Sequence, residues 1–450
     1  MNELTTLNRD AEAGVGEHGP LEPISPQTIQ SLREAIESRL GRTLEMLHEL
    51  VSINSFTRNV EGVGAVAELT ALHFASLGFE AEHIESADQH FGDHLVLTRH
   101  GRGDMTIGLV SHLDTVYTAE EEAQNHFHWQ VEGDRIYGPG TIDIKGGTAM
   151  IWLVLDTLRE AAPEAFEQVT WRVMLNAAEE ELAQDFSALL RHRLRGAAAC
   201  LVFEASQRKE QGWGVVTRRK GMATFDIEVF GRSAHAGSAH ERGASALLQM
   251  ARVIERVAAI SDPVRELSAN VGVVSGGTVV NRIPHHATAR LELRAYDPEV
   301  LEDAVARVFE IAREEDVVSA DGAFRCRIVA HQSQRVSAWP ENEGSKGLFA
   351  IWREAGQAAG ETVVAESRGG LSDGNKAWPV VPTIDGLGPS GDNMHASERD
   401  PEHGKEPEYV EPASFLPRAL VNATAILRLI EYDRAGNLPR ANSHDKGAGR

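Results

Sequence analysis

Apolar residues alternate between helix-like and strand-like spacing along most of the chain. A stripe with spacings of four and three residues predicts one first helix, and it contains Leu32, Ile36, Leu40, Leu44 and Leu47. Further helices are predicted for about 63–77, 147–160, 346–358 and 412–432, and buried strands for 107–111, 169–175 and 198–203. Because strands alternate with helices, we predict an α/β fold with a mostly parallel central sheet.

The pattern changes near residue 217. Phe225, Ile227 and Val229 alternate with acidic residues, as in a strand that has one exposed face. The segments that follow predict a helix at about 242–259, strands at 269–275 and 290–294, a helix after Pro298 and a strand at 324–330. This β-α-β-β-α-β order is that of a ferredoxin-like α+β unit.

These patterns divide the chain into one interrupted domain and one inserted domain. We expect the α/β domain to consist of 28–217 and 335–433, and the α+β insert to cover 218–334. The polar ends, 1–27 and 434–450, are expected to be loosely ordered.

Composition excludes several partners. With 44 basic and 67 acidic residues among 450, the formal net charge is −23, and such a surface repels nucleic acid and anionic lipid. Cys200 and Cys326 form neither a disulfide framework nor a CxxC site. The start lacks a secretory signal pattern, and the longest apolar runs, 149–155 and 197–203, are too short to span a bilayer. We therefore expect a cytoplasmic protein without membrane or nucleic-acid partners.

Metal-binding residue types follow the predicted strands, at the sheet edge where α/β domains form their sites. His112 and Asp114 follow the strand that ends at Val110, and Asp143 lies in a glycine-rich turn before a helix. The other candidates in strand-end or loop positions are Glu179, Glu180, Glu181, Glu204 and His395.

Taken alone, each candidate has a simpler interpretation, such as a structural histidine, a helix-capping turn or a solvated acidic run. Together they supply two histidines, one aspartate and two glutamates as ligands, plus one free glutamate. A two-metal hydrolytic site needs such a set, with a carboxylate bridging cations about 3.5–4 Å apart. Mixed imidazole and carboxylate ligands suit Zn²⁺, with Co²⁺ or Mn²⁺ as alternatives. The free glutamate would take a proton from the attacking water.

The order of these motifs resembles the M20 metallopeptidases, and within them the carboxypeptidase G2/glutamate carboxypeptidase-like branch. The resemblance covers about residues 30–432 and includes HxD at 112–114, GxxDxKGG at 140–147 and the glutamate pair at 179–180. It implies a zinc-exopeptidase-like catalytic domain interrupted by a dimerisation domain, and a homodimer.

The resemblance also assigns the ligands. Asp143 would bridge two divalent metal ions, His112 and Glu204 would complete one metal site, and Glu180 and His395 the other. The family often has a cis peptide bond directly after the bridging aspartate.

Two further residues of this centre receive roles from the resemblance. Glu179 would be the general base, and Asp114 would orient His112. A third glutamate, Glu181, makes the register of the pair ambiguous, and the position of Asn176 favours Glu179 and Glu180.

The insert carries the remaining expectations. His235, in the segment 231–237, resembles a family histidine that reaches the active site of a partner subunit and stabilises an oxyanion. Asn281 and Arg294 resemble residues that hold a substrate carboxylate, although Arg294 also fits a cross-strand salt bridge. Gly370 lies in a segment that resembles the glycine-rich substrate loop of the family.

We therefore expect a two-metal hydrolase that cleaves an amide bond next to a free carboxylate and releases an amino acid. One alternative is an N-acyl-amino-acid deacylase or carbamoyl-type amidohydrolase with the same site and a different pocket. A remote alternative is a non-catalytic dimeric binding protein with the same fold. Loss of a ligand or of the base would favour that last alternative, but all six positions are present.

Overall fold

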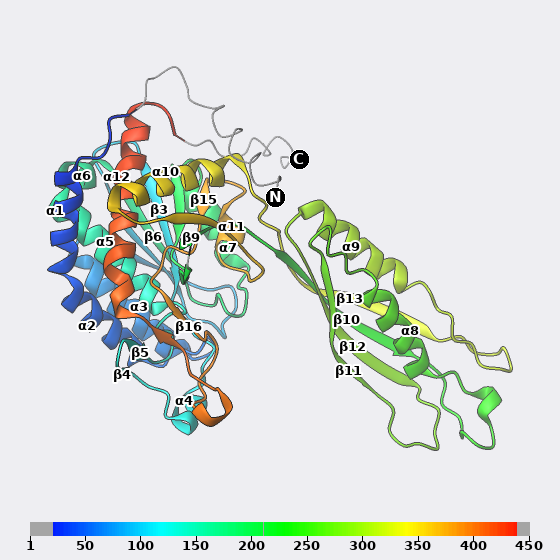
Figure 1. Ribbon diagram of the computed structural model, residues 1–450. Helices are drawn as coiled ribbons and strands as arrows, with labels where there is room; N and C mark the ends of the chain where they lie inside the picture. The colour runs from blue at the N-terminus through cyan, green and yellow to red at the C-terminus, as the bar shows by residue number, and fades with distance from the viewer. Residues whose placement is uncertain (1–20, 210, 439–450) are drawn as a thin grey trace. The chain divides into compact units, whose positions relative to one another are not determined.

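The computed structural model describes residues 21–209 and 211–438, and its internal contacts define two compact units (Figure 1). The first unit comprises the chain up to Thr217, Glu341–Glu366 and the chain from Ser372 onward. The second comprises Arg218–Pro340 and Ser367–Leu371, where the sequence led us to expect an insert over 218–334. Most of the two polar ends, 1–20 and 439–450, lies outside the described residues.

A six-stranded sheet forms the centre of the first unit. Its order is β1 (Glu80–Ile84), β2 (His94–Arg99), β6 (Thr170–Asn176), β3 (Thr106–His112), β7 (Ala199–Val202) and β15 (Thr383–Ile384). Strands β6, β3, β7 and β15 are parallel, whereas β1 and β2 pair antiparallel at one edge. The prediction of a mostly parallel sheet is therefore confirmed, with an antiparallel edge that the apolar pattern did not reveal.

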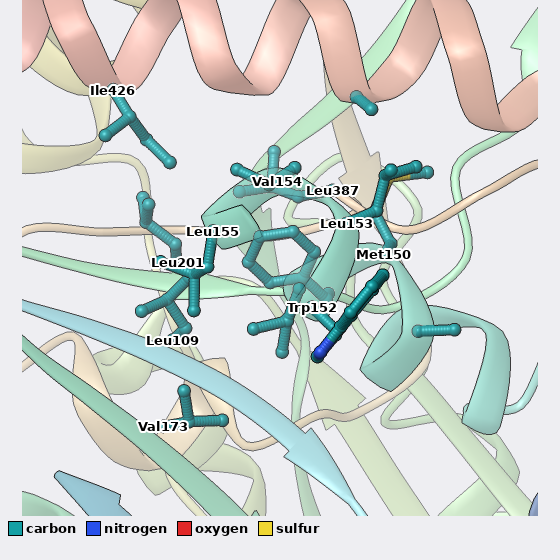
Figure 2. Packing of buried hydrophobic residues seen from close by; sticks show 14 of the residues in the cluster. Leu109, Met150, Trp152, Leu153, Val154, Leu155, Val173, Leu201, Leu387 and Ile426 are labelled. Atoms are coloured by element: carbon teal, nitrogen blue, oxygen red, sulfur yellow. The ribbon is translucent and has the colours of Figure 1, made fainter. Parts of the chain in front are cut away.

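Both faces of this sheet are covered by helices. Successive residues of a strand point to opposite faces, so Leu109 joins one apolar cluster and Val110 another. Helix α5 (Lys145–Ala161) fills the larger cluster with Met150, Leu153 and Val154, as Figure 2 shows. The other face packs against α7 (Asp185–Leu194) and α11 (Gly374–Ala377). The remaining helices of this unit are α1 (Pro26–Glu37), α2 (Leu40–Val51), α3 (Val60–Ala75), α4 (Ala119–Asn125), α6 (Pro163–Gln168), α10 (Glu343–Ala359) and α12 (Phe415–Arg434).

The prediction of one continuous first helix is wrong, because the stripe is shared by α1 and α2. Helix α1 starts earlier than expected, where Ser25 caps the N–H of Thr28. The break falls at Ser38 and Arg39. The Arg39 side chain turns away to bind the carboxylates of Asp156 and Glu160 on α5. The apolar spacing survives across the break, so periodicity alone could not detect it.

Helix α12 differs from the other helices in its apolar length. With the 3-10 turn before it (Pro412–Ser414), it is long and apolar enough to cross a bilayer by length and composition alone. However, 78% of its most apolar window is buried inside the first unit. Helix α12 is therefore best explained as a core helix, packed against α5 and α10.

Two small sheets complete the first unit and the connections to the second. One has the order β16 (Gly391–Asp392), β17 (Tyr409–Val410), β5 (Arg135–Tyr137) and β4 (Gln130–Glu132). The other has the order β14 (Val363–Arg368), β9 (Gly212–Arg219) and β8 (Arg208–Lys209). The first of these sheets matters for the site, because it flanks the loops before α5 and after β16.

The second unit is an antiparallel sheet with two helices. The strands have the order β11 (Ser268–Gly276), β12 (His286–Ala295), β10 (Gly221–Phe230) and β13 (Arg327–Val336). Helices α8 (Ala246–Ala258) and α9 (Pro298–Ile311) cover the apolar face, where Phe225, Ile227 and Leu291 are buried. A short 3-10 turn, His240–Arg242, precedes α8. This arrangement confirms the predicted ferredoxin-like order.

Candidate metal centre

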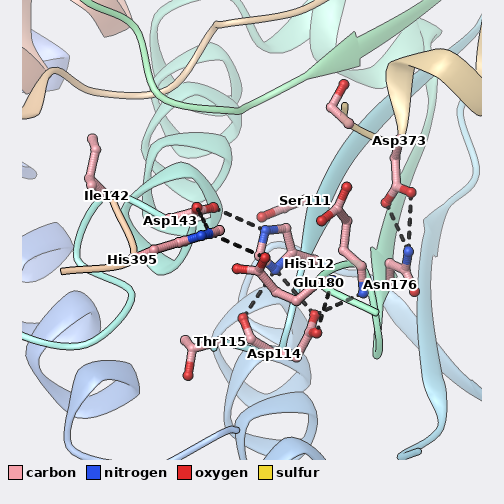
Figure 3. A network of polar contacts seen from close by, with 12 residues as sticks. Ser111, His112, Asp114, Thr115, Ile142, Asp143, Asn176, Glu180, Asp373 and His395 are labelled. Atoms are coloured by element: carbon pink, nitrogen blue, oxygen red, sulfur yellow. Dashed lines mark hydrogen bonds and ion pairs between the residues drawn. The ribbon is translucent and has the colours of Figure 1, made fainter. Parts of the chain in front are cut away.

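Three neighbouring strands of the central sheet deliver the predicted site residues from their carboxyl ends. His112 is the last residue of β3, Glu179 and Glu180 follow the end of β6, and Glu204 follows β7. Since β6, β3 and β7 are adjacent and parallel, their ends meet at one edge of the sheet. Figure 3 shows the polar residues that gather there.

Asp143 lies in the loop between β5 and α5 and faces two histidines. Its Oδ1 is 3.2 Å from Nε2 of His112, and its Oδ2 is 3.2 Å from Nε2 of His395 (Figure 3). The two oxygens therefore point to different imidazoles, as a bridging ligand requires. The peptide bond between Asp143 and Ile144 is cis, as the resemblance led us to expect.

Gly147 allows α5 to begin close to the centre. A Cβ atom at this position would lie 2.1 Å from the carbonyl oxygen of Phe203, the residue before Glu204. Only glycine permits so close an approach between the first turn of α5 and the end of β7. The glycines after Asp143 therefore serve packing as well as loop conformation.

Asp114 connects His112 with the loop of the glutamate pair. Its Oδ1 lies 3.2 Å from Nδ1 of His112 and accepts the N–H of Glu179 at 3.1 Å. Its Oδ2 accepts the N–H of Glu180 at 3.3 Å and the hydroxyl of Thr57 at 2.8 Å. Asp114 is fully buried, so these donors replace its hydration. A carboxylate behind a histidine ligand fixes the tautomer and the ring orientation.

The three glutamates point to different partners. Glu180 Oε2 lies 3.3 Å from Nε2 of His395, and a ligand atom of Glu180 lies within 4.8 Å of those of His112 and Asp143. Glu181 pairs instead with Arg58, through a 2.6 Å bond from Nε and a second bond from Nη2. Glu179 is buried, with 9% of its surface exposed. Glu180 therefore faces the histidines, whereas Glu181 binds Arg58 and does not.

Hydrogen bonds to carboxylates raise the pKa values of both histidines. Burial alone would lower the pKa of His112, but its bonds to Asp114 and Asp143 raise that pKa well above the ordinary value. Bonds to Asp143 and Glu180 raise the pKa of His395 to about 10. Burial opposes ionisation of Asp143, yet the two histidines hold its pKa below the ordinary value. The cluster therefore attracts positive charge strongly.

The three glutamates have raised pKa values, in contrast to the lowered pKa of Asp143. Burial, helped by the carboxylates of Asp373 and Glu180, raises the pKa of Glu179 to about 8. Loss of solvent, followed by the charge of Asp143, raises the pKa of Glu204 well above its ordinary value. Burial and Asp143 likewise raise the pKa of Glu180. Carboxylates crowded in this way are expensive to ionise unless cations compensate their charge.

The donor set fits divalent cations. Among the described residues, Oε1 of Glu180 is a buried oxygen without a hydrogen-bond partner, although its other oxygen faces His395. His112, Asp143 and Glu180 each offer a ligand atom within 4.8 Å of the others, and His395 contacts both Asp143 and Glu180. Such mixed imidazole and carboxylate sets suit Zn²⁺ and related ions. Glu204 is linked to this group by its electrostatic coupling to Asp143 and His112.

A buried polar chain behind Glu179 escaped the sequence interpretation. Lys376 Nζ lies 2.7 Å from Oδ1 of Asp373, and the side-chain amide of Asn176 donates to both oxygens of Asp373 at 3.1 and 3.2 Å. Lys376 and Asp373 are nearly inaccessible to solvent. Asp373 lies in the glycine-rich segment 369–374 that resembles the substrate loop, and Lys376 follows it by two residues, but no sequence signal distinguished either residue.

Glu408 is a second residue that the sequence interpretation missed. It is fully buried, accepts the N–H of Asp143 and the hydroxyl of Tyr117, and has a pKa raised to about 7 by burial and by the charge of Asp143. A signal was available, because Glu408 directly precedes the apolar pair Tyr409–Val410. The same criterion, an acidic residue next to a buried strand, had singled out Glu204.

Two predicted residues of the second unit lie in neighbouring loops. His235 is exposed, and its Nδ1 accepts the N–H groups of Gly237 at 3.1 Å and Ser238 at 3.2 Å. In the neutral ring the proton must then sit on Nε2, which makes Nε2 a donor. Asn281 is exposed beside it, and its carbonyl accepts the N–H of Ala236 at 2.9 Å.

Arg294 and Gly370 also lie in the second unit. Arg294 forms a paired bond with Glu292, at 2.7 Å from Nε and 2.9 Å from Nη2, and its Nη1 donates to the carbonyl of Gly369 at 3.0 Å. Arg294 is therefore engaged in a salt bridge, but with Glu292 of its own strand β12 and not across two strands as the alternative expected. Arg219 donates to the carbonyls of Gly370 and Leu371, at 3.0 Å each.

Comparisons with known proteins agree with this architecture. Residues 217–319 match the peptidase dimerisation domain of the M20 peptidases. The chain is 29% identical over 400 residues to carboxypeptidase G2 from Pseudomonas sp. (strain RS-16). The aligned region covers 88% of this chain and 91% of that protein.

Solved structures of low sequence identity share the fold. Aminopeptidase PepT from Bacillus cereus ATCC 10987 aligns with a TM-score of 0.70 at 22% identity, over 87% of this chain and 99% of that one. The M20 family metallo-carboxypeptidase Sso-CP2 from Sulfolobus solfataricus aligns with a TM-score of 0.65 at 14% identity, over 86% and 99%. The dimerisation-domain match and the similarity to carboxypeptidase G2 along most of its length relate the chain to the M20 peptidases.

Proposed function

We propose that this protein is a metal-dependent hydrolase that cleaves an amide bond next to a free carboxylate and releases an amino acid. The observation that carries this proposal is the convergence of His112, Asp143, Glu180 and His395, with the buried Glu179 in the same loop as Glu180. The similarity to a carboxypeptidase along 88% of the chain supports the reaction class.

We assign the ligands as two sets that share Asp143. His112 and Glu204 complete one set, and Glu180 and His395 complete the other. The opposite orientation of the two Asp143 oxygens supports this division. When bound, two Zn²⁺ ions, or Co²⁺ or Mn²⁺ in their place, would supply Lewis-acid polarisation of the amide carbonyl and acidify a water molecule.

Glu179 is our choice for the general base. It is not part of the hydrogen-bonded ligand cluster, and its backbone is fixed by Asp114 at 3.1 Å. The side chain would accept a proton from the attacking water and return it to the leaving amine nitrogen. Asp114 is a positioning residue, because it holds both His112 and the Glu179–Glu180 backbone.

Asn281, Arg294 and Gly370 are proposed contacts for the substrate carboxylate. Arg294 offers a planar guanidinium suited to carboxylates, and its bond to Gly369 places it beside the glycine-rich segment. To bind a substrate carboxylate by two bonds, Arg294 would exchange its pairing with Glu292 for the ligand.

We also propose a cytoplasmic homodimer. Both cysteines are buried and free, in keeping with a reducing compartment. The edge strand β11, the segment that follows it and helix α8 expose large apolar side chains, as expected of a surface that pairs with a second copy. These residues are Leu247, Leu248, Val273, Val274, Val279 and Val280.

The proposed role of His235 predicts a specific result for mixed dimers. His235→Ala is expected to lower kcat by about 10²–10³-fold without changing the dimer, because an oxyanion donor is lost. Co-expression of His235→Ala with Glu179→Gln should restore about a quarter of wild-type activity, since half of the dimers carry one intact site. If His235 acted within its own subunit, no activity would return.

A substrate panel tests the reaction itself. Dipeptides, acyl-glutamates, acyl-aromatic amino acids and N-carbamoyl amino acids should be assayed in parallel with added Zn²⁺, Co²⁺ or Mn²⁺, and the products identified. We expect hydrolysis only of amides that carry a free carboxylate next to the cleaved bond. Equal hydrolysis of the carboxamide analogues would contradict this substrate class, and no hydrolysis with any metal would favour a binding protein.

A further inference from the structure

A buried carboxylate outside the proposed ligand set connects the loops of the metal centre. Oε1 of Glu408 accepts two adjacent backbone N–H groups, those of Ile142 at 2.8 Å and Asp143 at 3.1 Å. Its other oxygen, Oε2, accepts the hydroxyl of Tyr117 at 2.7 Å. Glu408 has no exposed surface, so these three donors take the place of water.

The backbone of the same residue reaches the second loop. The N–H of Glu408 donates to the carbonyl of Ala396 at 2.8 Å, and Ala396 directly follows His395. The Tyr117 hydroxyl is also 3.4 Å from the Ala396 carbonyl. One residue therefore contacts the loop of Asp143, the loop of His395 and the segment that follows the His112–Asp114 motif.

These contacts matter because they hold the part of the loop before α5 that carries Asp143, whereas the bonds from Thr141 to Gly138 and from Lys145 to Gly140 close the turns around it. Helix α5 starts at Lys145, so the N–H groups of Ile142 and Asp143 lie before its helical hydrogen bonds and need an acceptor outside the helix. A buried carboxylate next to Asp143 is also unfavourable for charge reasons, since like charges repel. Its presence is explained if the position of its oxygens is needed for the site.

We propose that Glu408 is a positioning residue that holds the Asp143 and His395 loops at the spacing required for metal binding. This inference rests on the proposed metal centre. Removal of residues that support metal ligands typically weakens metal affinity by about 10–100-fold. We expect the effect of Glu408 on metal affinity to depend on the position of its two side-chain oxygens and not on its negative charge.

Two near-isosteric variants separate position from charge. Glu408→Gln keeps an oxygen for the two N–H groups, and its amide can donate to Tyr117, whose hydroxyl can then donate to Ala396. Glu408→Asp keeps the charge but withdraws the carboxylate by one methylene group. Asp156→Ala is the matched control, because it removes a buried carboxylate of the same unit whose partners, within the described ranges 21–209 and 211–438, are Arg39 and Arg159.

The experiment is calorimetric titration of the metal-free full-length protein with Zn²⁺ alone, with thermal unfolding of each variant measured in parallel. We expect zinc affinity within about threefold of wild type for Glu408→Gln and Asp156→Ala, and a loss of about 10–100-fold for Glu408→Asp. Wild-type affinity in Glu408→Asp, or an equal loss in Glu408→Gln, would overturn the positioning role. An equal loss in Asp156→Ala would also overturn it, because general destabilisation would then explain the effect. Failure of the wild-type protein to bind zinc would instead overturn the proposed metal centre and this inference with it.

Discussion

Replacing Glu179 with glutamine is expected to lower kcat by about 10²–10⁴-fold while the protein retains its full metal content. Glutamine has nearly the same shape, so it preserves the backbone bond from residue 179 to Asp114. It cannot accept a proton from water, and the chemical step loses its base. Metal content should be unaffected, because the proposed ligands are the neighbouring Glu180 and four other residues.

The adjacent glutamate offers a matched control for this result. Glu181→Gln changes the same chemical group two positions away, but Glu181 is paired with Arg58 outside the centre. We expect wild-type kcat for this variant. Metal analysis by mass spectrometry and initial rates on one hydrolysed substrate would test both variants. Full activity in Glu179→Gln, or its loss in Glu181→Gln, would show that the base has been assigned wrongly.

The strand ends of this centre could be predicted because β6, β3 and β7 have long apolar runs that stop at polar residues. His112, Glu179, Glu180 and Glu204 each follow such a run, and parallel strands bring their ends together. The apolar pattern therefore contained both the fold class and the edge of the sheet where a site would form.

Other features depend on contacts between distant segments, which periodicity does not record. The antiparallel pairing of β2 with β6 and the break between α1 and α2 are of this kind. Glu408 lies 265 positions from Asp143 in the sequence, and only the folded chain places them within hydrogen-bond distance. Lys376 and Asp373 similarly form a local pair whose relation to Glu179 appears only in three dimensions.

Removing the metal ions with a chelator is expected to abolish activity and to make the stability of the folded protein fall between about pH 5 and pH 8. In the metal-free protein, burial and nearby carboxylates raise the pKa of Glu179 from 4.5 to about 8, and the pKa of Glu204 is raised in the same direction. Over this range the folded protein holds protons that the unfolded chain has already lost. The resulting contribution to stability is complete below the unfolded pKa and disappears as pH rises through the folded pKa.

The pKa shifts of His395 and Asp143 do not reverse this sign. His395 also has a raised pKa, about 10, so its contribution declines above its ordinary value of 6.5. Asp143 has a lowered pKa and alters stability only below about pH 4, outside the window. Bound cations would replace the missing positive charge, and at a hundredfold excess over Kd they stabilise a folded protein by about 2.7 kcal/mol.

Thermal unfolding of chelated and zinc-loaded protein at pH 5.5, 6.5, 7.5 and 8 would measure this effect. We expect the Tm difference between the two forms to widen as pH rises. Glu179→Gln is the informative control, because its neutral side chain removes one of the titrating groups without removing a proposed ligand. Its metal-free form should lose less Tm between pH 5.5 and 8 than the metal-free wild type. A difference between chelated and loaded protein that stays constant with pH would mean that the cations do not compensate the charge of these buried carboxylates.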